Sequence, residues 1–370
     1  MSGIVLSASV RQNLLSLQST ADLLSTTQSR LATGNKVNSA LDNPTNFFTA
    51  QGLNNRSSDI NNLLDSIGNG VQVIQAANQG ITSIQKLVDT AKSIANQALQ
   101  ASSGYSAKSS STSSAALAGT AANLVDGTQI VAGDVLAVAA SDANPAVSFT
   151  FTATTSLDDL NSALSASNLK ATINGDNKLV ITSTNNEAAS STIGAVTLTG
   201  TGTLAFAAPV APTADADSQA ARKNLITQFN QVIDQIKTTA QDSSYNGINL
   251  LNGDQLKLVF NETGKSTLTI QGVDFNPEGL GLSSLTAGTD FLDNNGTNKV
   301  LDSLGKASSL LRSQASAFGS NLSVVQIRQD FNKNLINVLQ TGASNLTLAD
   351  TNEEAANSQA LSTRQSIAVS

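Results

Sequence analysis

The stretch that decides the fold is VRQNLLSLQSTADLLSTTQSRL, from Val10 to Leu31, because its apolar residues recur at alternating steps of four and three. A sustained spacing of this kind places one narrow apolar stripe along a helix, which is then buried against other helices. The stripe consists of Val10, Leu14, Leu17, Ala21, Leu24 and Leu31, with Gln28 at its one polar position. The sequence therefore predicts a first helix that pairs with other helices through leucines.

The other end of the chain carries the same spacing, which predicts a closing helix from about Asn298 to Ser358. Its stripe consists of Leu301, Leu304, Leu311, Ala315, Phe318, Leu322, Val325, Ile336, Leu339, Ala343 and Leu346, with Ser308, Gln329 and Asn332 as polar members. Matching ends around a different middle indicate a building block whose termini pair with each other and with copies of itself. The residues that we expect to form the polymerisation seam are Val10, Leu14, Leu17, Leu24, Leu31, Leu322, Val325, Ile336, Leu339 and Leu346.

Composition narrows the function classes. The chain has no Cys, His or Trp, which excludes thiolate metal sites and the commonest general base and zinc ligand. Its 20 basic and 27 acidic residues give a mildly acidic protein, so we expect no nucleic-acid partner. No apolar run of about eighteen residues exists, so we expect no membrane span. The start, MSGIVLSASV, lacks the basic region and continuous apolar core of a secretory signal.

A second helix follows a turn-rich bridge. Gly34 stands where a helix C-cap is expected, and Pro44 can open the next helix after Asp42 and Asn43. The second stripe contains one 3-3 step, from Ile74 to Ala77, where we expect the helix to be overwound or bent. Its members are Ile60, Leu64, Ile67, Val71, Ile74, Ala77, Ile81, Ile84, Val88, Ala91, Ala95 and Ala98.

The pattern changes after Ser102, and residues 102–217 are expected to form a separate α+β insert. Alternating runs predict strands at Val147–Ala153, Lys178–Ser183 and Ala195–Gly200. Between the first two, Leu157, Leu160 and Leu164 lie one helical face apart, with Ser156 as N-cap. The Ser/Thr patch Ser109–Ser114 and the segment FAAPVAPTAD, residues 206–215, are interpreted as linkers.

Helical spacing returns at Leu225, Phe229, Val232 and Ile236. The dipeptides Asn246-Gly247 and Asn252-Gly253 then predict tight turns. LKLVFNE and STLTIQG alternate on either side of residues 262–265, which predicts a β-hairpin.

Three stretches resemble chemical sites but lack the residues that such sites require or have a structural explanation. TGKST at Thr263–Thr267 lacks the first glycine of a phosphate loop, and DFNPEG at Asp274–Gly279 lacks the acid at position twelve of a calcium loop. Asp158 and Asp159 are explained by the first turn of a helix, where acids are stabilised by the macrodipole. We therefore expect no enzyme, cofactor or metal site.

Several motifs together resemble bacterial flagellins. RLATGNKVNSALDNPTNFF, from Arg30 to Phe48, resembles the family's N-terminal signature, of the form RLxSGxxINSAxDxxA, and its Asn-Pro step with two Phe resembles the alphaproteobacterial type. NGVQVIQAANQGITSI, SSYNGINLLNG and NLTLADTNEEAA are similar to further family segments, in the same order. Residues 156–187 resemble the small "IN" module of flagellins and hook proteins. Members usually continue with a further apolar helix, whereas this chain stops at RQSIAVS, through truncation or a short terminal helix.

The resemblance implies a mainly α protein that is secreted and polymerises into the extracellular flagellar filament for swimming. Residues 1–45 and 330–370 correspond to inner-tube helices, residues 46–101 and 218–329 to an outer-tube helical bundle with a β-hairpin, and residues 102–217 to the surface insert. Implied partners are other copies, the hook-filament junction and cap proteins, an export chaperone and the flagellar secretion apparatus.

The resemblance also bears on recognition by the vertebrate Toll-like innate receptor. Strongly sensed flagellins carry LQRVRELAVQ, where this chain has VDTAKSIANQ, from Val88 to Gln97. Thr90 and Ser93 replace Arg and Glu, and Lys92 keeps a charge without the planar fork of an arginine. We expect the surface formed by Val88, Thr90, Lys92 and Ser93 not to activate the receptor.

Two alternatives remain open. A hook-filament junction protein resembles flagellin at both ends, and NSALDNPTNF at Asn38–Phe47 partly favours it, whereas YNGINLLNG favours the filament subunit. A secreted coiled-coil adhesin is an alternative of another class, whose heptads would serve a fixed trimer.

Overall fold

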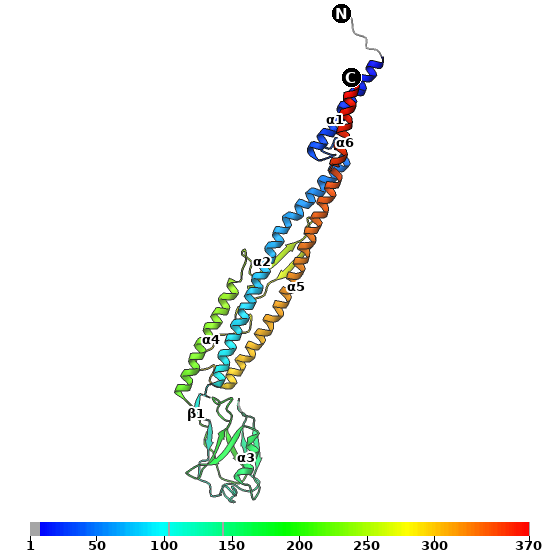
Figure 1. Ribbon diagram of the computed structural model, residues 1–370. Coiled ribbons are helices and arrows are strands. Elements are labelled where there is room, and N and C mark those ends of the chain that lie inside the picture. Colours follow the sequence, from blue (N-terminus) through cyan, green and yellow to red (C-terminus); the bar gives the residue numbers. More distant parts are fainter. Residues whose placement is uncertain (1–7, 103, 143, 370) are drawn as a thin grey trace. The chain divides into compact units, whose positions relative to one another are not determined.

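The computed structural model describes residues 8–102, 104–142 and 144–369, and the side chains among them up to residue 367. The first seven residues, part of the stretch tested above for a secretory signal, lie outside the described chain. Two compact units divide the fold. Unit 1 contains Met1–Gln75, Gln255–Gln271 and Gly319–Ser370, and unit 2 contains Ala76–Asp254 and Gly272–Phe318. The mainly α fold with helices from both termini, a β-hairpin and an α+β insert is confirmed (Figure 1).

The terminal helices of unit 1 lie side by side. Helix α1 (Ala8–Thr33) ends at Gly34, whose φ of +71° and N–H bond to Arg30 O (2.8 Å) form the expected C-cap. Helix α6 (Thr351–Val369) runs back along α1 in the opposite direction (Figure 1). An antiparallel bridge between Asn35 and Leu348 joins the segments that lead into this pair.

Helix α2 (Pro44–Gln100) begins at the predicted proline, and the Asn43 side chain caps it by accepting from Asn46 N (3.0 Å). Helix α5 spans Asn294–Thr347. In unit 1 they share a small core of Ile60, Ile336 and Leu339. The boundary between the units on α2 falls between Gln75 and Ala76, inside the predicted 3-3 step. Whether the helix is overwound there stays a prediction.

The hairpin of unit 1 is the predicted one. Strands β9 (Gln255–Val259) and β10 (Thr267–Gln271) pair antiparallel. Three contacts attach the residues beyond β9 to helices: Asn332 Nδ2 donates to Phe260 O (3.0 Å), the Arg328 guanidinium lies over the Phe260 ring, and Arg56 pairs with Glu262 (2.7 Å).

The prediction of a single closing helix from Asn298 to Ser358 is wrong in one respect. This stretch contains two helices, because α5 ends at Thr347 and α6 begins at Thr351. Asp350 causes the restart, because its Oδ1 accepts from the N–H groups of Asn352 (2.9 Å) and Glu353 (3.3 Å). An N-capping aspartate that satisfies first-turn donors favours a helix start, which the heptad pattern alone does not reveal.

In unit 2, α2 packs with α4 (Ala216–Asp242) and the first half of α5. The predicted face of α4 is shifted by one residue: Phe229 and Ile236 are buried as expected, but Ile226 and Ile233 replace Leu225 and Val232. The predicted residues and the buried residues both follow 4-3 spacing, and both sets contain Phe229 and Ile236. Periodicity alone therefore cannot tell which of the two helix faces is buried. The turn at Asn246-Gly247 is confirmed, with φ of +49° and +80° and mutual backbone bonds between Tyr245 and Ile248.

The insert in unit 2 contains two three-stranded antiparallel sheets and helix α3 (Leu157–Ser165), whose predicted cap Ser156 forms a capping box with Asp159. One sheet has the order β2-β6-β5 and the other β4-β3-β7. Leu160 and Leu164 of α3 are buried in the insert's core. The strands are β2 (Ser110–Thr112), β3 (Val135–Val138), β4 (Val147–Thr150), β5 (Leu169–Ile173), β6 (Leu179–Ser183) and β7 (Val196–Thr199).

The linker interpretation of both flanks is wrong. The Ser/Thr patch forms β2, and the hydroxyls of Ser109 and Ser111 are buried where they donate to Val210 O and Ala207 O (2.7 Å each). Small polar side chains can be buried in a strand when nearby carbonyls satisfy them. β1 (Tyr105–Ala107) also pairs with β8 (Thr213–Ala214), inside the segment interpreted as the second linker.

Candidate assembly surfaces

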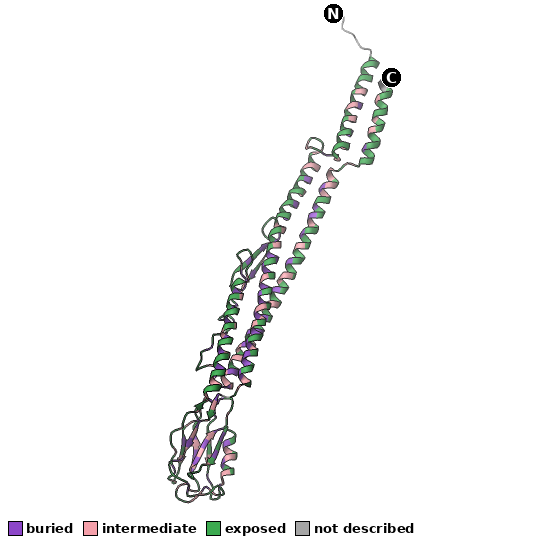
Figure 2. Cartoon of the chain, turned by 60° about the vertical axis from the view of Figure 1, so that its left-hand side comes forward, coloured by how far each residue is buried: buried purple, intermediate pink, exposed green. Residues whose placement is uncertain are grey.

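The contact between α1 and α6 is thin. Only Thr20 and Thr27 of α1 are buried, with Leu17 and Leu24 half-buried, and among the described side chains of α6 only Glu354 is buried. Glu354 pairs with Arg30 at 3.2 Å. Figure 2 shows both helices mostly in the colour of exposed residues. The pair therefore uses a threonine-lined face of α1 and leaves most of its leucines uncovered.

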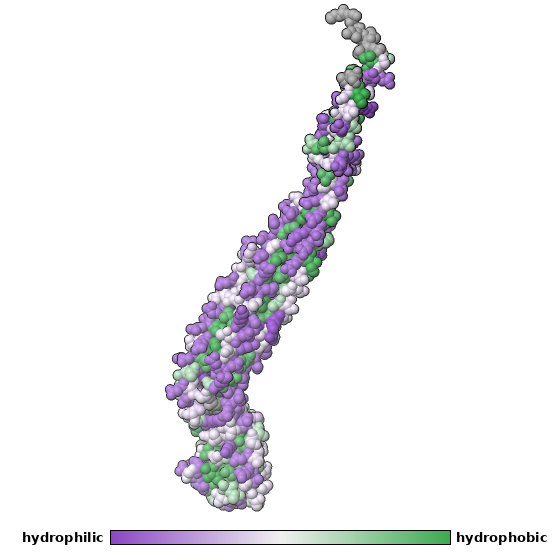
Figure 3. Space-filling model, in the orientation of Figure 1, coloured by the Kyte–Doolittle hydropathy of each residue, from purple (hydrophilic) through white to green (hydrophobic). Residues whose placement is uncertain are grey.

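Of the predicted seam residues of α1, Leu17 and Leu24 are half-buried, whereas the other three are exposed. Leu14 is 57% exposed, and Val10 and Leu31 are exposed as well. Leu15 and Leu23, which the heptad did not include, extend this surface. Figure 3 shows hydrophobic residues on the surface of the region of unit 1 that contains α1. Because an α-helix has about 3.6 residues per turn, these five positions lie on different sides of α1, so the helix exposes apolar side chains around most of its circumference.

The predicted seam residues of α5 face inward instead. Val325, Ile336 and Leu339 are buried, and Leu322 and Leu346 are half-buried. Their partners are side chains of the same chain, since Ile336 and Leu339 share a cluster with Ile60. The 4-3 spacing therefore marks residues of α5 that are buried within the chain. Their role in contacts between copies stays a prediction.

Sequence reasoning missed a second stripe on α5. Ile327 is 66% exposed, and Val324, Phe331 and Val338 are also large exposed apolar residues. Their steps of three, four and seven follow a helical face, so the signal was present in the sequence. It was hidden because each position lies within two residues of the stronger inner stripe.

The polar members of the stripes fix contacts inside the chain. Ser308 is buried and accepts from Gln85 Nε2 (2.9 Å). Asn332 is buried and bonds to the hairpin, as described above, while Gln329 is half-buried. A single polar residue in an apolar seam specifies register, because a shifted partner would leave it unsatisfied.

The proposed receptor surface is smaller than the sequence suggested. Val88 is fully buried, and Lys92 is half-buried. Thr90 and Ser93 are exposed, and the Thr90 hydroxyl donates to Lys86 O within its own helix (3.0 Å). Thr90 and Ser93 are therefore the residues that a receptor can reach directly in the single chain.

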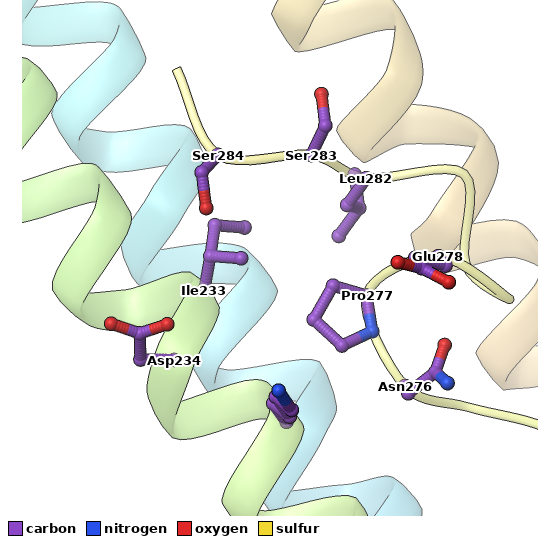
Figure 4. A pocket seen from close by; sticks show the side chains of 9 residues that line it. Ile233, Asp234, Asn276, Pro277, Glu278, Leu282, Ser283 and Ser284 are labelled. Atoms are coloured by element: carbon purple, nitrogen blue, oxygen red, sulfur yellow. The ribbon is translucent and has the colours of Figure 1, made fainter. Parts of the chain in front are cut away.

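A surface pocket of about 400 Å³ lies in unit 2 between α4 and the loop at residues 276–284 (Figure 4). Ile233, Asp234 and Lys237 form its α4 side, with Pro277 and Glu278 opposite. The described chain contains no group of three or more acidic residues that could hold a metal ion. No helix of the described chain is long and apolar enough to cross a membrane.

Paired terminal helices with uncovered leucines are typical of a helical subunit that has apolar surface left for partners. Residues 5–135 match the family model of the bacterial flagellin N-terminal helical region. Flagellin FljJ of Caulobacter vibrioides is 30% identical over 149 residues, which are 39% of this chain and 53% of that protein. This chain thus spans about half the length of that relative. The resemblance to bacterial flagellins is therefore confirmed, and residues 5–135 are the part of the chain that is similar to the flagellin N-terminal helical region.

A solved structure gives a weaker likeness. The D1-D2-D3 domains of the flagellar cap protein FliD from Escherichia coli align with 70% of this chain and 99% of that chain. The sequence identity is 12% and the TM-score 0.21.

Proposed function

We propose that this chain is a structural subunit of the bacterial flagellar filament, exported and polymerised outside the cell for swimming. The observation that carries the proposal is that α1 leaves four leucines exposed, Leu14, Leu15, Leu23 and Leu31, in a region that matches the flagellin N-terminal helical model. Burial of apolar surface is the main favourable term in protein association. Other copies of this chain are the partners that such a repeated surface suits.

Two surfaces would take part in assembly. The first is the α1 surface of Val10, Leu14, Leu15, Leu23 and Leu31, and the second is the α5 stripe of Val324, Ile327, Phe331 and Val338. Contact between two different surfaces of identical subunits is heterologous, and such a contact generates open filaments when its rotation does not close. In this arrangement residues 1–45 and 330–370 form the inner tube, residues 46–101 and 218–329 form the outer bundle, and the insert, residues 102–217, lies on the exterior.

The remaining roles follow from the same proposal. The junction and cap proteins would bind the ends of the filament, and an export chaperone would cover the apolar helices before secretion through the flagellar apparatus. The chain would act mechanically rather than as an enzyme. The exposed apolar surfaces of α1 and α5 would carry the load between subunits, while the inner stripe and its polar members hold the helices of each subunit together.

Electron microscopy of the purified chain tests the proposal. Sulfate or phosphate salts strengthen apolar burial and should promote assembly. We expect filaments of micrometre length with a regular helical repeat. Short caps would instead favour a junction protein, and discrete rods of fixed length would favour a trimeric adhesin; either result would contradict the filament role.

A further inference from the structure

A buried arginine lies where the insert joins the helices of unit 2. Arg222, on α4, is 1% exposed and forms no ion pair within the described chain. Its guanidinium donates only to neutral acceptors. Nε donates to Ser102 O and Nη1 to Phe291 O, both at 3.0 Å, and Nη2 donates to Asn294 Oδ1 (3.0 Å) and Ala101 O (3.4 Å). A buried cation of this kind is tolerated only when hydrogen bonds replace its hydration.

The acceptors of Arg222 come from different parts of the chain. Ala101 and Ser102 follow the last residue of α2, whereas Phe291 precedes α5 and Asn294 is its first residue. One side chain on α4 therefore joins the exit of α2 to the start of α5. Arginine suits this place because its five donors form a rigid planar fork, which lysine lacks. Burial lowers the pKa of Arg222 from its ordinary value, although nearby Asp293 opposes this effect.

The insert completes the same junction from its other side. Asp293 caps α5 by accepting from Gly296 N (3.0 Å), and its second oxygen accepts from Ser190 N (3.2 Å) and the Ser190 hydroxyl in the insert. Asn295 N donates to the carbonyl of Glu187, also in the insert (2.7 Å). The first N–H groups of a helix have no partner within the helix. The insert supplies one of these partners for α5.

The strands at the base of the insert add a further attachment. β1 and β8 pair directly before α4 begins, so the chain enters and leaves the insert through one short ladder. The Gln219 side chain of α4 donates to Gly104 O (2.9 Å), and Asp215 N donates to the same carbonyl (2.9 Å). These contacts replace the flexible linkers expected from composition.

We infer that the insert is a brace for the helical part of unit 2, and that the Arg222 guanidinium and the cap shared by Asp293 and Ser190 hold it in place. The insert and the ends of α2, α4 and α5 then form one cooperative unit. This differs from the separate insert, attached through flexible linkers, that the sequence predicted.

A distance measurement on the full chain tests the role of Arg222. Because the chain has no cysteine, Thr172→Cys in β5 and Gln235→Cys in α4 introduce two spin labels at exposed positions without background. We expect a narrow distance distribution in the otherwise unchanged chain and one at least about twice as wide in Arg222→Met. Lys223→Met, a change at the exposed neighbouring residue, is the matched control and should leave the distribution narrow. An equally narrow distribution in Arg222→Met would overturn the inference.

A second measurement approaches the junction from the insert and does not depend on folding of the arginine variant. Ser190→Ala removes a hydroxyl donor to Asp293 but leaves every helical residue unchanged. We expect amide hydrogen exchange at residues 295–297 to become about tenfold faster, as for loss of a hydrogen bond to a charged group. Thr192→Ala, an exposed change nearby in the insert, should leave these rates unchanged. Unchanged exchange in Ser190→Ala would show that the insert does not support the start of α5.

Discussion

Single residues decide how closely the elements can approach. Gly70 lies in the middle of α2, where glycine usually weakens a helix. A Cβ built there would lie 2.3 Å from Leu258 Cδ2 of the hairpin, so the missing side chain is what admits β9. In the insert, Gly200 and Gly202 make room in the same way, since a Cβ at either position would lie 2.0 or 2.2 Å from a carboxylate oxygen of Asp134.

A comparison of two glycines on α2 tests the packing at Gly70. Gly70→Ala should lower the free energy of unfolding by about 1–3 kcal/mol, because Leu258 is buried and must move to avoid the new methyl group. Gly52→Ala is the matched control, since nothing lies within 4 Å of a Cβ there. Its helix should gain about 0.5–1 kcal/mol. Denaturant unfolding measures both, and two stabilised variants would show that Gly70 is not a packing residue.

Asp134 predicts an acid-sensitive insert. Burial alone raises its pKa, but backbone N–H bonds from Val131, Thr201 and Gly202 outweigh burial and hold the pKa below the ordinary 3.8. A lowered folded-state pKa contributes stability above the unfolded value, and that stability is lost as pH falls through the folded value.

We therefore expect the insert to lose stability below about pH 4, with Asp134→Asn less stable at neutral pH but less sensitive to acid. Thermal unfolding followed by circular dichroism between pH 2 and 7 measures this. Asp176→Asn, in an exposed turn, is the control. An Asp134→Asn variant with the acid response of the parent would exclude the role of this carboxylate.

At the scale of elements, α5 shows how one helix can serve two purposes. Its inner stripe is buried against the same chain, while Val324, Ile327, Phe331 and Val338 stay exposed on another face. An amphipathic helix normally has one apolar stripe that faces the core and a polar surface elsewhere. A second stripe is therefore surface left for another partner.

Changes in the outer stripe should separate assembly from folding. The double variant Ile327→Gln and Phe331→Gln removes apolar contacts that are worth about 1.5–3 kcal/mol for each fully buried side chain. Because both residues are exposed in the single chain, we expect unchanged thermal stability of the monomer but loss of filaments in sedimentation and microscopy. Asn334→Gln, also exposed on this helix, should assemble normally. Normal filaments from the double variant would remove this stripe from the assembly surface.

At the scale of the molecule, the two terminal helices are held less firmly than the part of α5 that lies in unit 1. The residues of α5 that lie in unit 1 share a core with α2 and a buried bond to the hairpin. Among the described residues of the α1–α6 pair, three side chains are buried, Thr20, Thr27 and Glu354, and Glu354 forms an ion pair with Arg30. Isolated helix pairs with little buried surface open readily.

Trypsin can measure this difference. In the monomer we expect cleavage after Arg11 and Arg30 of α1 well before cleavage after Arg328 and Lys333 of α5, because local opening of α1 costs less free energy. Polymerisation should protect the α1 sites. Equal cleavage rates at both sets in the monomer would show that the terminal helices are as stable as the rest.

The last prediction concerns the innate receptor. Thr90 is exposed but offers one short hydroxyl, already bonded within its helix, where an arginine would offer five donors and a long planar contact. We expect little or no receptor activation by the soluble monomer in a reporter-cell assay, and a gain of response in Thr90→Arg. Lys86→Arg, a change that preserves charge on the same helix, is the control. Strong activation by the unchanged chain would contradict this expectation.

Local signals in the sequence determined most of the elements. The 4-3 spacing located α1, α2 and α5, Pro44 and Gly34 marked their ends, and Asn246-Gly247 and the alternating runs located a turn and the hairpin. These features were readable because a cap, a turn or a helical face depends on neighbours within a few residues along the chain. The restart at Asp350 and the shifted face of α4 escaped this reading, because competing local signals there have similar strength.

The tertiary structure alone decided which apolar face is covered and which polar groups are satisfied. Ile336 and Ile327 each belong to an apolar stripe with helical spacing on α5. Ile336 is nevertheless buried against α2, whereas Ile327 is exposed. Arg222, Ser109 and Ser111 resemble surface residues in the sequence, but they are buried because carbonyls distant along the chain accept their hydrogen bonds. Periodicity in the sequence shows that a helix has an apolar stripe, but it does not show which segment packs against that stripe. Burial and hydrogen bonding depend on segments that are distant in the sequence and that only the fold brings together.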